Sequence, residues 1–568
     1  MKHIIKALEK NKEKIFLVLA IVLIAIFAFS ITPKQMQNDI YYTVTIGNLI
    51  RENGIDNTDH FSWHEGLPYT YPHWLYDVGM NFIYNMGGFE AIYISTCVFS
   101  CLLGISIFLV NSKLTKNNLL SFIVTIAVLY LIKGYITARA QLVTFILFIL
   151  LVYNIERFLE NKKIINAIAL FFIHILIANL HAAVWPFAFV LYLPYIAEYI
   201  IAEFLDVLIY KKIQIVYLKY RLKILLNKTK RKNLKNREKI NQKISDFNEK
   251  ILKLQDRIQK IKIKRKEEEG KEYKVTIKKN KNVRWLIIIM IITILTGFLT
   301  PIGKTPFAYT YLTIKGNTTH NINEHLPLTL TNNIPMLCTM IVLIALIGFT
   351  RIKIRLSDLF MIGGLTYLMF YTRRQQSMLV LIGSIAFTRM LKNFFEILIN
   401  IPIDDMLEKC FNKFTAFLLI AVMISWSLHL YSKTKNQKYV NENTYPVKAS
   451  EWILANLDVN NIRLYNEYNY GSYLLFKGIP VFIDSRADLY APEFNTPSGE
   501  AAEGRDIFMD FINSSNMSTY YGDIFEKYNI THVILYKNSK IAMLIRKADA
   551  EKYKEIYSDD KFVIYEIL

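Results

Sequence analysis

The side chains that could do chemistry gather where long apolar segments end. Asp39 lies seven residues beyond the first of these segments, and Arg139 lies on a short turn between two others. A carboxylate can accept a proton from a hydroxyl group, and a guanidinium can hold a phosphate through parallel N–H donors. Similar polar residues follow at comparable positions, namely Asp59, Gln141, Asn179, His181, Glu324, Arg373 and Arg374. Together they indicate a site for an anion and a hydroxyl group.

Each of these residues alone also has an ordinary interpretation. Any turn between apolar segments is polar, and an arginine such as Arg139 or Arg373 can extend its side chain to lipid headgroups. Aromatic residues near the ends of membrane spans commonly lie at the interface. The combination is more informative, because short turns hold side chains rigidly at the depth of a lipid-linked phosphate. We therefore expect Arg139, Arg373 or Arg374 to bind such a phosphate.

Motifs of soluble enzymes are absent from the sequence. There is no Walker loop, no glycine-rich dinucleotide fingerprint, no His-Glu-x-x-His and no Gly-x-Ser-x-Gly. His60 and His64 could place two imidazoles on one helical face, but Asn57, Thr58 and Asp59 favour a turn there. We therefore predict no cofactor. The sequence gives no support for a divalent metal but does not exclude one.

The apolar segments that carry these residues determine the class of protein. The chain has 568 residues, of which 53% are hydrophobic, and it also has 68 Lys or Arg and 47 Asp or Glu residues. The charges are concentrated in separate blocks, and nearly uncharged runs of about 18 residues or more recur between them. This composition excludes a soluble globular enzyme, a disordered chain and a disulfide scaffold. It predicts an α-helical polytopic membrane protein.

Eleven apolar segments are expected to span the membrane. They cover residues 15–32, 89–110, 119–134, 141–155, 164–180, 183–205, 285–301, 334–350, 357–372, 376–391 and 414–431. Residues 211–284 carry 27 Lys or Arg against 8 Asp or Glu, a net charge of +19 out of +21 for the whole chain. Basic loops face the cytoplasm, so we place this segment and the N-terminus inside. The other turns that then fall inside are also basic, and the C-terminus lies outside.

This topology divides the chain into four parts in a multi-pass cell-membrane protein. They are an N-terminal transmembrane part at 1–205 with an outer loop at 33–77, a basic cytoplasmic insertion at 206–284, a second transmembrane part at 285–431, and an extracytoplasmic domain at 432–568. In the last part, short apolar strands are expected at 462–465, 481–484 and 532–536, with helices at 447–457, 506–513, 520–528 and 540–548. Alternating strands and helices predict a small α/β domain.

The basic insertion has a pattern of its own. From Ile240 to Ile261, apolar residues follow a four-three spacing, and Ile215 to Leu225 gives a shorter matching stripe. We predict an antiparallel, coiled-coil-like helical hairpin with its turn at 227–233, and a seam between two protomers is the alternative. Its basic surface could lie against anionic lipids. Nucleic-acid binding is not expected, because no motif supports it.

Short motifs in the outer segments follow a familiar order. They are Asp39-Ile-Tyr-Tyr, Gly47, Asp59-His-Phe-Ser-Trp, Trp74-Leu75, Arg139-Ala-Gln141, Asn179-Leu-His181, Thr300-Pro301, Asn323-Glu324, Tyr465 to Leu474 and Val481 to Asp488. In this order the chain resembles the membrane glycosyltransferases of the GT-C fold that use polyprenyl-phosphate sugars, within the bacterial group related to protein O-mannosyltransferases (family 39-like). Ala140, His73 and His325 depart from the usual pattern.

The resemblance implies a reaction and its partners. Asp39 would be the general base, because the family places its catalytic acid just after the first helix, and Asp59 would orient the sugar or the acceptor. The donor would be a polyprenyl-phosphate sugar, and the acceptor a glycan, lipid or protein hydroxyl of the cell envelope, at the extracytoplasmic face and among membrane lipids. Two alternatives remain: a non-catalytic membrane scaffold with this fold, and a component that translocates lipid or polysaccharide.

Overall fold

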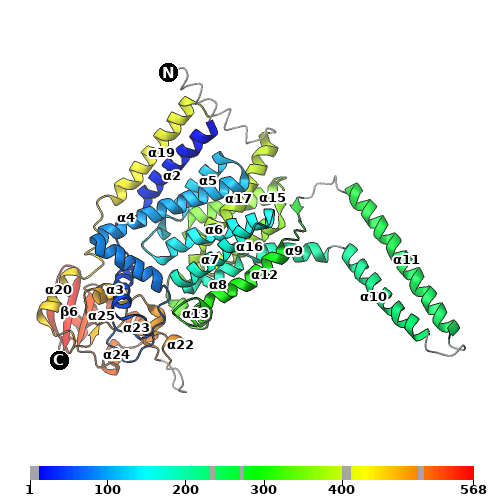
Figure 1. Cartoon of the computed structure of the whole chain (residues 1–568). Coiled ribbons are helices and arrows are strands. Elements are labelled where there is room, and N and C mark those ends of the chain that lie inside the picture. Colours follow the sequence, from blue (N-terminus) through cyan, green and yellow to red (C-terminus); the bar gives the residue numbers. More distant parts are fainter. Residues whose placement is uncertain are drawn as a thin grey trace.

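The computed structural model describes residues 12–205, 207–229, 237–268, 274–316, 318–399, 411–496 and 505–568. Helices make up most of these residues, and two small sheets contain the strands. Figure 1 shows the apolar helices gathered in one bundle, with a sheet domain at the C-terminal end and a helical hairpin that projects from another side. The residues of the candidate site lie where the bundle meets the sheet domain.

Six helical stretches within the described residues are long and apolar enough to cross a membrane. Four of them are single helices, namely α2 (Lys12–Ile31), α4 (Trp74–Thr115), α6 (Ala140–Asn161) and α19 (Lys413–Thr434). The fifth, Ala182–Phe204, comprises η2 (Ala182–Val184), α8 (Trp185–Val190) and α9 (Leu193–Phe204). The sixth, Arg373–Ile397, comprises η6 (Arg373–Gln375) and most of α17 (Gln376–Ile399). A membrane location is therefore plausible on length and composition.

Five shorter apolar helices account for the remaining expected spans. They are α5 (Asn118–Leu131), α7 (Ile164–Leu180), α12 (Val283–Ile294) with η4 (Leu295–Phe298), α15 (Ile334–Phe349) and α16 (Leu356–Tyr371). Each of the eleven expected segments is thus mostly helical. That all eleven cross the membrane stays a prediction, because these five are shorter than the roughly 20 residues that a bilayer usually requires.

Helix α4 changes direction at a pair of glycines. Gly87 and Gly88 have non-helical backbone angles, and Gly88 has a φ of +62°, which a residue with a Cβ rarely adopts. The part of α4 before this pair carries Asp77 and packs beside α3 (Asn38–Asn53). The part after it is apolar and runs into the bundle. The kink therefore separates a shorter first part of α4, which carries Asp77 and Asn81, from a longer apolar part.

Helices α3 and α4 approach each other closely at Gly47. A Cβ atom at this position would lie 2.1 Å from the carbonyl oxygen of Asp77, so a larger residue does not fit without a shift of the backbone. Nearby, the Asn81 side chain of α4 donates to the carbonyl oxygen of Val44 at 3.0 Å. These contacts hold the middle of α3 against the beginning of α4, and Asp39 lies in the first turn of α3.

The C-terminal residues form a four-stranded mixed sheet in the order β3-β4-β6-β5. Strand β3 (Leu464–Tyr465) pairs with β4 (His532–Tyr536) in parallel, and β6 (Phe562–Ile567) is antiparallel to both β4 and β5 (Tyr553–Ser558). The helices of this domain are α20 (Val447–Asn456), α21 (Tyr468–Phe476), α22 (Pro492–Asn495), α23 (Ile507–Asn516), α24 (Tyr521–Lys527) and α25 (Lys540–Ala548). Sequence patterns did not predict α21 or the β5–β6 hairpin.

The strand predicted at 481–484 is wrong. These residues lie outside the sheet and contact the segment before α4, where the Trp63 N–H donates to the Val481 carbonyl at 3.3 Å and the Val481 N–H donates to the Phe61 carbonyl at 3.2 Å. The Asn466 side chain also donates to the Ile483 carbonyl at 2.7 Å. The apolar run is buried by these contacts, and burial rather than pairing in the sheet explains its pattern.

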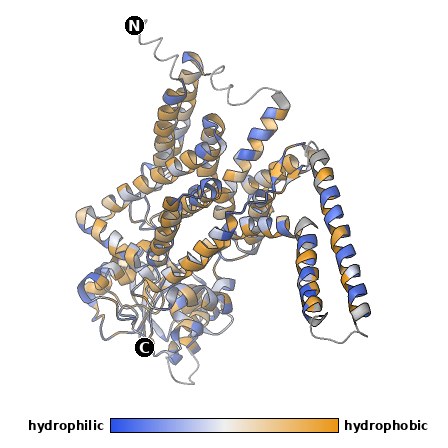
Figure 2. Cartoon of the chain, turned by 45° about the vertical axis from the view of Figure 1, so that its right-hand side comes forward, coloured by the Kyte–Doolittle hydropathy of each residue, from blue (hydrophilic) through white to orange (hydrophobic). Residues whose placement is uncertain are grey.

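Residues 207–268 contain two long helices that pack along each other. α10 (Val207–Thr229) and α11 (Arg237–Glu268) project away from the bundle as a hairpin (Figures 1 and 2). Ile215 and Ile251, which belong to the predicted seam, are buried. The turn predicted at 227–233 starts too early, because α10 continues to Thr229, and its later part lies outside the described residues.

Four charged side chains form a closed cluster within the bundle, beside the two-residue parallel pairing of β1 (Val275–Thr276) with β2 (Ile354–Arg355). Glu156 lies 2.7 Å from Arg355 and 3.1 Å from Arg389, and Asp358 lies 2.7 and 2.8 Å from the same two arginines. Tyr195 donates to Glu156 at 2.9 Å. We call Glu156, Arg355, Asp358 and Arg389 the closed ion cluster.

Candidate functional site

A large cavity lies between the bundle and the C-terminal domain. Its volume is about 1070 Å³, slightly above the range of roughly 300–1,000 Å³ that is usual for ligand pockets. Its polar wall comes from the start of α3, from residues 68–73, from residues 318–325 and from residues 485–489. Its apolar wall includes Phe145, Phe148, Phe187, Val190, Leu368 and Met378. We call this space the main cavity, and its lining can accommodate a ligand that is partly polar and partly apolar.

An arginine lies between two carboxylates at the polar wall. Arg139 immediately precedes α6, and its Nε lies 2.8 Å from Oδ2 of Asp39, while its Nη1 lies 3.0 Å from Oε1 of Glu324. Burial disfavours the charged guanidinium, but the two carboxylates outweigh this and raise the pKa of Arg139. The same arginine outweighs burial at Glu324 and lowers the pKa of that carboxyl. We call these three residues the cavity ion cluster.

The cavity ion cluster is accessible to ligands. The side chains of Asp39, Arg139 and Glu324 are 23%, 25% and 46% exposed. All three line the main cavity, and Asp39 lies in the first turn of α3, where the N-terminal helix dipole favours a negative charge. The predicted proximity of Asp39 and Arg139 is therefore present, and the cluster could exchange one of its internal contacts for a contact with substrate.

Arg374 supplies a second cation to the main cavity. Its backbone N–H donates to the carbonyl of Glu324 at 2.9 Å, and the N–H of Arg373 donates to the carbonyl of Leu326 at 2.9 Å, so η6 is held against the 318–327 segment. Among the described residues, no acidic side chain pairs with Arg374, whose guanidinium remains available to an anion. Arg373 lines a smaller cavity of about 430 Å³, which Arg139 and Glu324 also border.

Gln141 and His181 also line the main cavity. The Oγ1 atom of Thr144, one turn along α6 from Ala140, lies 3.1 Å from Nδ1 of His181, and this contact fixes the imidazole plane. Burial lowers the pKa of His181, and the charges of Arg374 and His73 lower it further. His181 is therefore neutral near pH 7 and could bind a sugar hydroxyl as a neutral hydrogen-bonding group.

Asn179 lies behind the cavity wall and does not line it. Its Nδ2 donates to the carbonyl of Leu299 at 3.0 Å, and its Oδ1 accepts from Nε1 of Trp74 at 3.1 Å. These bonds hold the end of α7 to the residue after η4 and to the start of α4. Asn179 therefore positions these three segments, and its contact with substrate stays a prediction.

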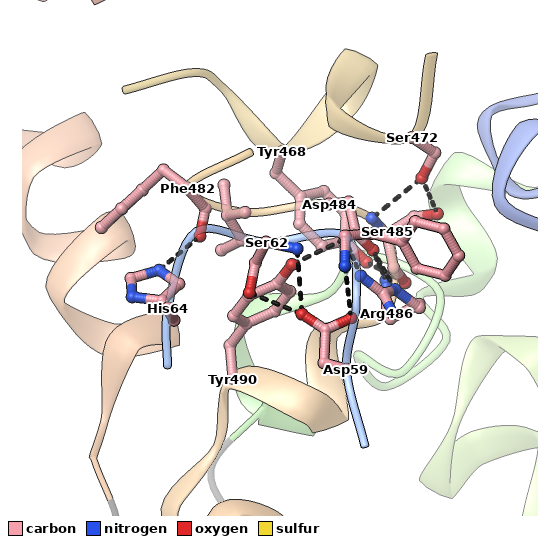
Figure 3. A network of polar contacts seen from close by, with 12 residues as sticks. Asp59, Ser62, His64, Tyr468, Ser472, Phe482, Asp484, Ser485, Arg486 and Tyr490 are labelled. Carbon is pink, nitrogen blue, oxygen red and sulfur yellow. Dashed lines mark hydrogen bonds and ion pairs between the residues drawn. The ribbon is translucent and has the colours of Figure 1, made fainter. Parts of the chain in front are cut away.

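Asp59 is buried in a network that joins two distant parts of the chain (Figure 3). Its Oδ1 accepts from Arg486 at 2.6 Å, and its Oδ2 accepts from Oγ of Ser62 at 2.5 Å. Burial would raise the pKa of Asp59, but Arg486 and the bonds from Ser62 lower it overall. Arg486 also pairs with Asp484 at 2.6 Å. Asp59 thus supports the cavity wall from behind, and it is Arg486 that borders the cavity.

A histidine and an aspartate that the sequence analysis did not assign to the site form a dyad. Nδ1 of His73 lies 2.8 and 2.9 Å from the two carboxylate oxygens of Asp77, and its Nε2 lies 3.1 Å from the hydroxyl of Tyr42. Because a carboxylate only accepts, Nδ1 carries a proton, and Nε2 of the neutral ring accepts from Tyr42. Burial opposes the charged ring, but Asp77 and Asp39 raise the pKa of His73 overall.

The C-terminal domain contributes further polar groups that sequence reasoning missed. Asp488, in η7 (Ala487–Tyr490), accepts from Tyr309 of α13 (Thr305–Lys315) and from Thr318 of α14 (Thr318–Asn321), the latter at 3.3 Å. Burial raises the pKa of Asp488, although these two bonds oppose it. The i, i+4 spacing of His73 and Asp77 could have revealed their pairing, but Asp488 and Tyr309 are 179 residues apart and no local pattern connects them.

The structure separates the two histidines that were considered as metal ligands. His60 lies 2.5 Å from Asp56, and Nε2 of His64 lies 2.8 Å from the carbonyl oxygen of Phe482. The residues between them are not helical, and Ser62 among them forms an isolated bridge with Val481. Across the described ranges, no group of three His, Cys, Asp or Glu side chains is placed so that it could hold a metal ion.

Comparisons with known proteins do not identify the chain. No protein-family model matches it, and no curated protein matches it either. Its function must therefore be inferred from the site itself.

Proposed function

We propose that the chain is a membrane glycosyltransferase that moves a sugar from a polyprenyl-phosphate donor to a hydroxyl group at the extracytoplasmic face. The observation that carries this proposal is the main cavity, in which Arg374 has no acidic partner among the described residues and lies near a pair formed by Asp39 and Arg139. An available cation beside a carboxylate is what a phosphate leaving group and an acceptor hydroxyl require.

The lining of the main cavity supports a lipid-linked donor. Along α6 it changes from Gln141 and Thr144 to Phe145 and Phe148, and apolar residues of α8, α16 and α17 continue this wall. A prenyl chain would lie against the apolar wall, since that buries its surface away from water. Its phosphate would then reach Arg374 and Arg139. A soluble nucleotide-sugar would gain nothing from the apolar part of the wall.

The reaction needs few groups. The acceptor hydroxyl transfers its proton to a carboxylate oxygen of Asp39 as its oxygen forms a bond to the anomeric carbon of the sugar. The bond between that carbon and the phosphate oxygen breaks, and the electron pair leaves with the phosphate. Arg374 and Arg139 stabilise the charge that develops there. Glu324 keeps Arg139 oriented through its 3.0 Å contact.

Two other functions make different predictions. A non-catalytic scaffold is favoured by one observation, which is that Asp39 already has a partner in Arg139 at 2.8 Å and could serve only to join α3 to α6. A translocation component would require a polar path through the whole bundle, whereas the main cavity has an apolar wall along α6, α8, α16 and α17. The scaffold is therefore the alternative that the experiment must distinguish.

The test uses the purified full-length protein in lipid nanodiscs. Polyprenyl-phosphate carrying radiolabelled glucose, mannose or arabinose is supplied as donor, and envelope membranes from cells without the protein serve as acceptor. We expect transfer from at least one donor, and loss of transfer in Asp39→Asn. The control is Asp56→Asn, because Asp56 lies in the same outer segment, just after α3, is 45% exposed and is not part of the cavity lining. Binding of donors without transfer would favour the scaffold. The absence of both binding and transfer would refute the proposal.

A further inference from the structure

Helix α10 has two apolar faces, and α11 covers only one of them. Ile215 is buried in the seam with α11, and Leu218 and Leu222 on the same face are partly buried. A second row of apolar side chains is exposed, with exposed fractions of 61% for Ile213, 66% for Val216, 55% for Tyr217, 64% for Tyr220 and 39% for Ile224. At 3.6 residues per turn, this three-and-four spacing places the row on one face, opposite Ile215 and Leu222.

Positive charges flank the exposed apolar row. Within Val207–Thr229 there are six Lys or Arg residues and no Asp or Glu. Lys212, Lys219 and Lys223 lie along one side of the row and Arg221 along the other, and all four are exposed. A helix with an apolar face, two tyrosines and flanking lysines has the composition of helices that lie in the interface of anionic membranes.

Helix α11 has a different surface. Its sequence contains six Asp or Glu residues among its basic residues. On its exposed surface, two of these acids form ion pairs, Glu249 with Lys253 at 2.5 Å and Asp256 with Lys260 at 2.9 Å. Figure 2 shows the hydrophobic and hydrophilic residues that alternate along both helices. The seam of α11 is apolar. Its outer surface carries both positive and negative charges and is therefore compatible with exposure to water.

The connection of α10 to the bundle brings it to the lipid surface. α9, in one of the candidate membrane spans, ends at Phe204, and α10 begins at Val207. Phe204 and Leu205 are 90% and 59% exposed, as expected where lipid surrounds the end of a span. On the other side of the hairpin, β1 leads into the apolar helix α12. Both ends of the hairpin are thus held next to apolar helices of the bundle.

We infer that α10 lies on the membrane surface, with the face from Ile213 to Ile224 in contact with anionic lipids and α11 directed to water. The apolar side chains would be removed from water, while the lysines would reach lipid phosphates. A second copy of the chain fits this face less well, because the basic flanks of two α10 helices would oppose each other without any acid in either. This inference is independent of the proposed transfer reaction.

Depth measurements in nanodiscs that hold one copy of the full chain test the inference. In a background without native cysteines, Tyr217→Cys and, as a second position on the same face, Tyr220→Cys are labelled with bimane. The control is Lys253→Cys on the outer surface of α11, where the native side chain is 69% exposed. With nitroxide-labelled lipids in a phosphatidylglycerol-rich bilayer, we expect at least about threefold stronger quenching at positions 217 and 220 than at 253.

The charge requirement has its own control. Lys219→Glu with Lys223→Glu, and separately a bilayer of phosphatidylcholine alone, should each reduce quenching at position 217 toward that at 253. Equal quenching by lipid at positions 217, 220 and 253 in the anionic bilayer would overturn the inference. Protection of position 217 from aqueous iodide without quenching by lipid would also overturn it, because protein and not lipid would then cover this face. Circular dichroism of each labelled variant checks that the helices remain folded.

Discussion

The two ion clusters use the same residue types and differ in how they are enclosed. In the closed ion cluster, two arginines meet two acids, and each acid contacts both arginines. The side chains of Glu156 and Asp358 are 9% exposed and that of Arg389 is 15% exposed, while Arg355, at 37%, lies at the edge of the cluster. In the cavity ion cluster, a single arginine lies between two acids, and Glu324 is 46% exposed. The first has the features of a structural clamp between helices. The second can change partners, and Arg374 lies nearby without an ion pair to any acidic side chain among the described residues.

The largest expected effect concerns the carboxylate of the cavity ion cluster. Asp39→Asn keeps the size of the side chain but removes its capacity to accept a proton, so transfer should fall by about 10²- to 10⁴-fold. Stability should change little, because Arg139 keeps Glu324 as a partner. Transfer rates and the thermal midpoint in detergent are measured together. Full activity in this variant would contradict the assignment of Asp39 as the base.

The closed ion cluster should respond in the opposite way. Arg389→Met removes a cation whose side chain is 15% exposed and leaves Glu156 and Asp358 with Arg355 alone. Breaking a buried pair on one side typically costs about 3–5 kcal/mol of folding free energy. We expect a large loss of folded protein in a thermal or denaturant series, and for the fraction that remains folded, a normal donor KM. A stable variant with a raised KM would remove the distinction between the clusters.

The two arginines of η6 should differ in their effect on donor binding. Arg374→Ala should lose charge-assisted hydrogen bonds to the phosphate of about 1.5–3 kcal/mol, seen as a raised KM for the polyprenyl-phosphate sugar. Arg374→Lys should recover only part of this loss, because lysine lacks the planar fork. Arg373→Ala is the matched control, since Arg373 lines only the smaller cavity, and its effect should be weaker. Equal losses at both positions would argue for a donor site that spans both cavities.

The smallest expected effect is a dependence of stability on pH at the dyad beside the cavity ion cluster. The pKa of His73 is raised above its ordinary value of 6.5, so its pairing with Asp77 stabilises the fold fully below about pH 6.5. This contribution is lost as the pH rises through the raised pKa. The difference in thermal midpoint between the wild type and His73→Gln should therefore shrink as the pH is raised above about 6.5. A constant or growing difference would contradict the direction of the shift.

The sequence predicted the helices of the bundle better than the site. Runs of apolar residues locate a helix because hydropathy is a local property, and all eleven expected segments are helical or mostly so. The turns that carry Asp39, Arg139 and Arg374 were identified for the same reason. A local property does not predict which side chains form ion pairs when they are far apart in the sequence. Arg139 and Glu324 are 185 residues apart, and Asp59 and Arg486 are 427 residues apart.

A local pattern gave a wrong prediction where apolar residues are buried by a distant segment of the chain and not by a sheet. The apolar residues at 481–484 were taken for a strand because strands are short and apolar, yet their neighbours are Phe61 and Trp63 in the segment before α4. That Asp59 orients the sugar or the acceptor stays a prediction, and in the structure its side chain is buried. Its role in the structure depends on Arg486, whose position relative to Asp59 only the tertiary fold determines.

The contact between Asp59 and Arg486 also bears on the order in which the protein is made. A ribosome adds about 5–20 residues each second, so Arg486 is synthesised on the order of tens of seconds after Asp59. During that interval the segment around Asp59 lacks its arginine, and the wall of the main cavity that contains Arg486 does not yet exist. A chain that stops before this residue therefore presents an incomplete site, and maturation of the protein waits for its last quarter to emerge.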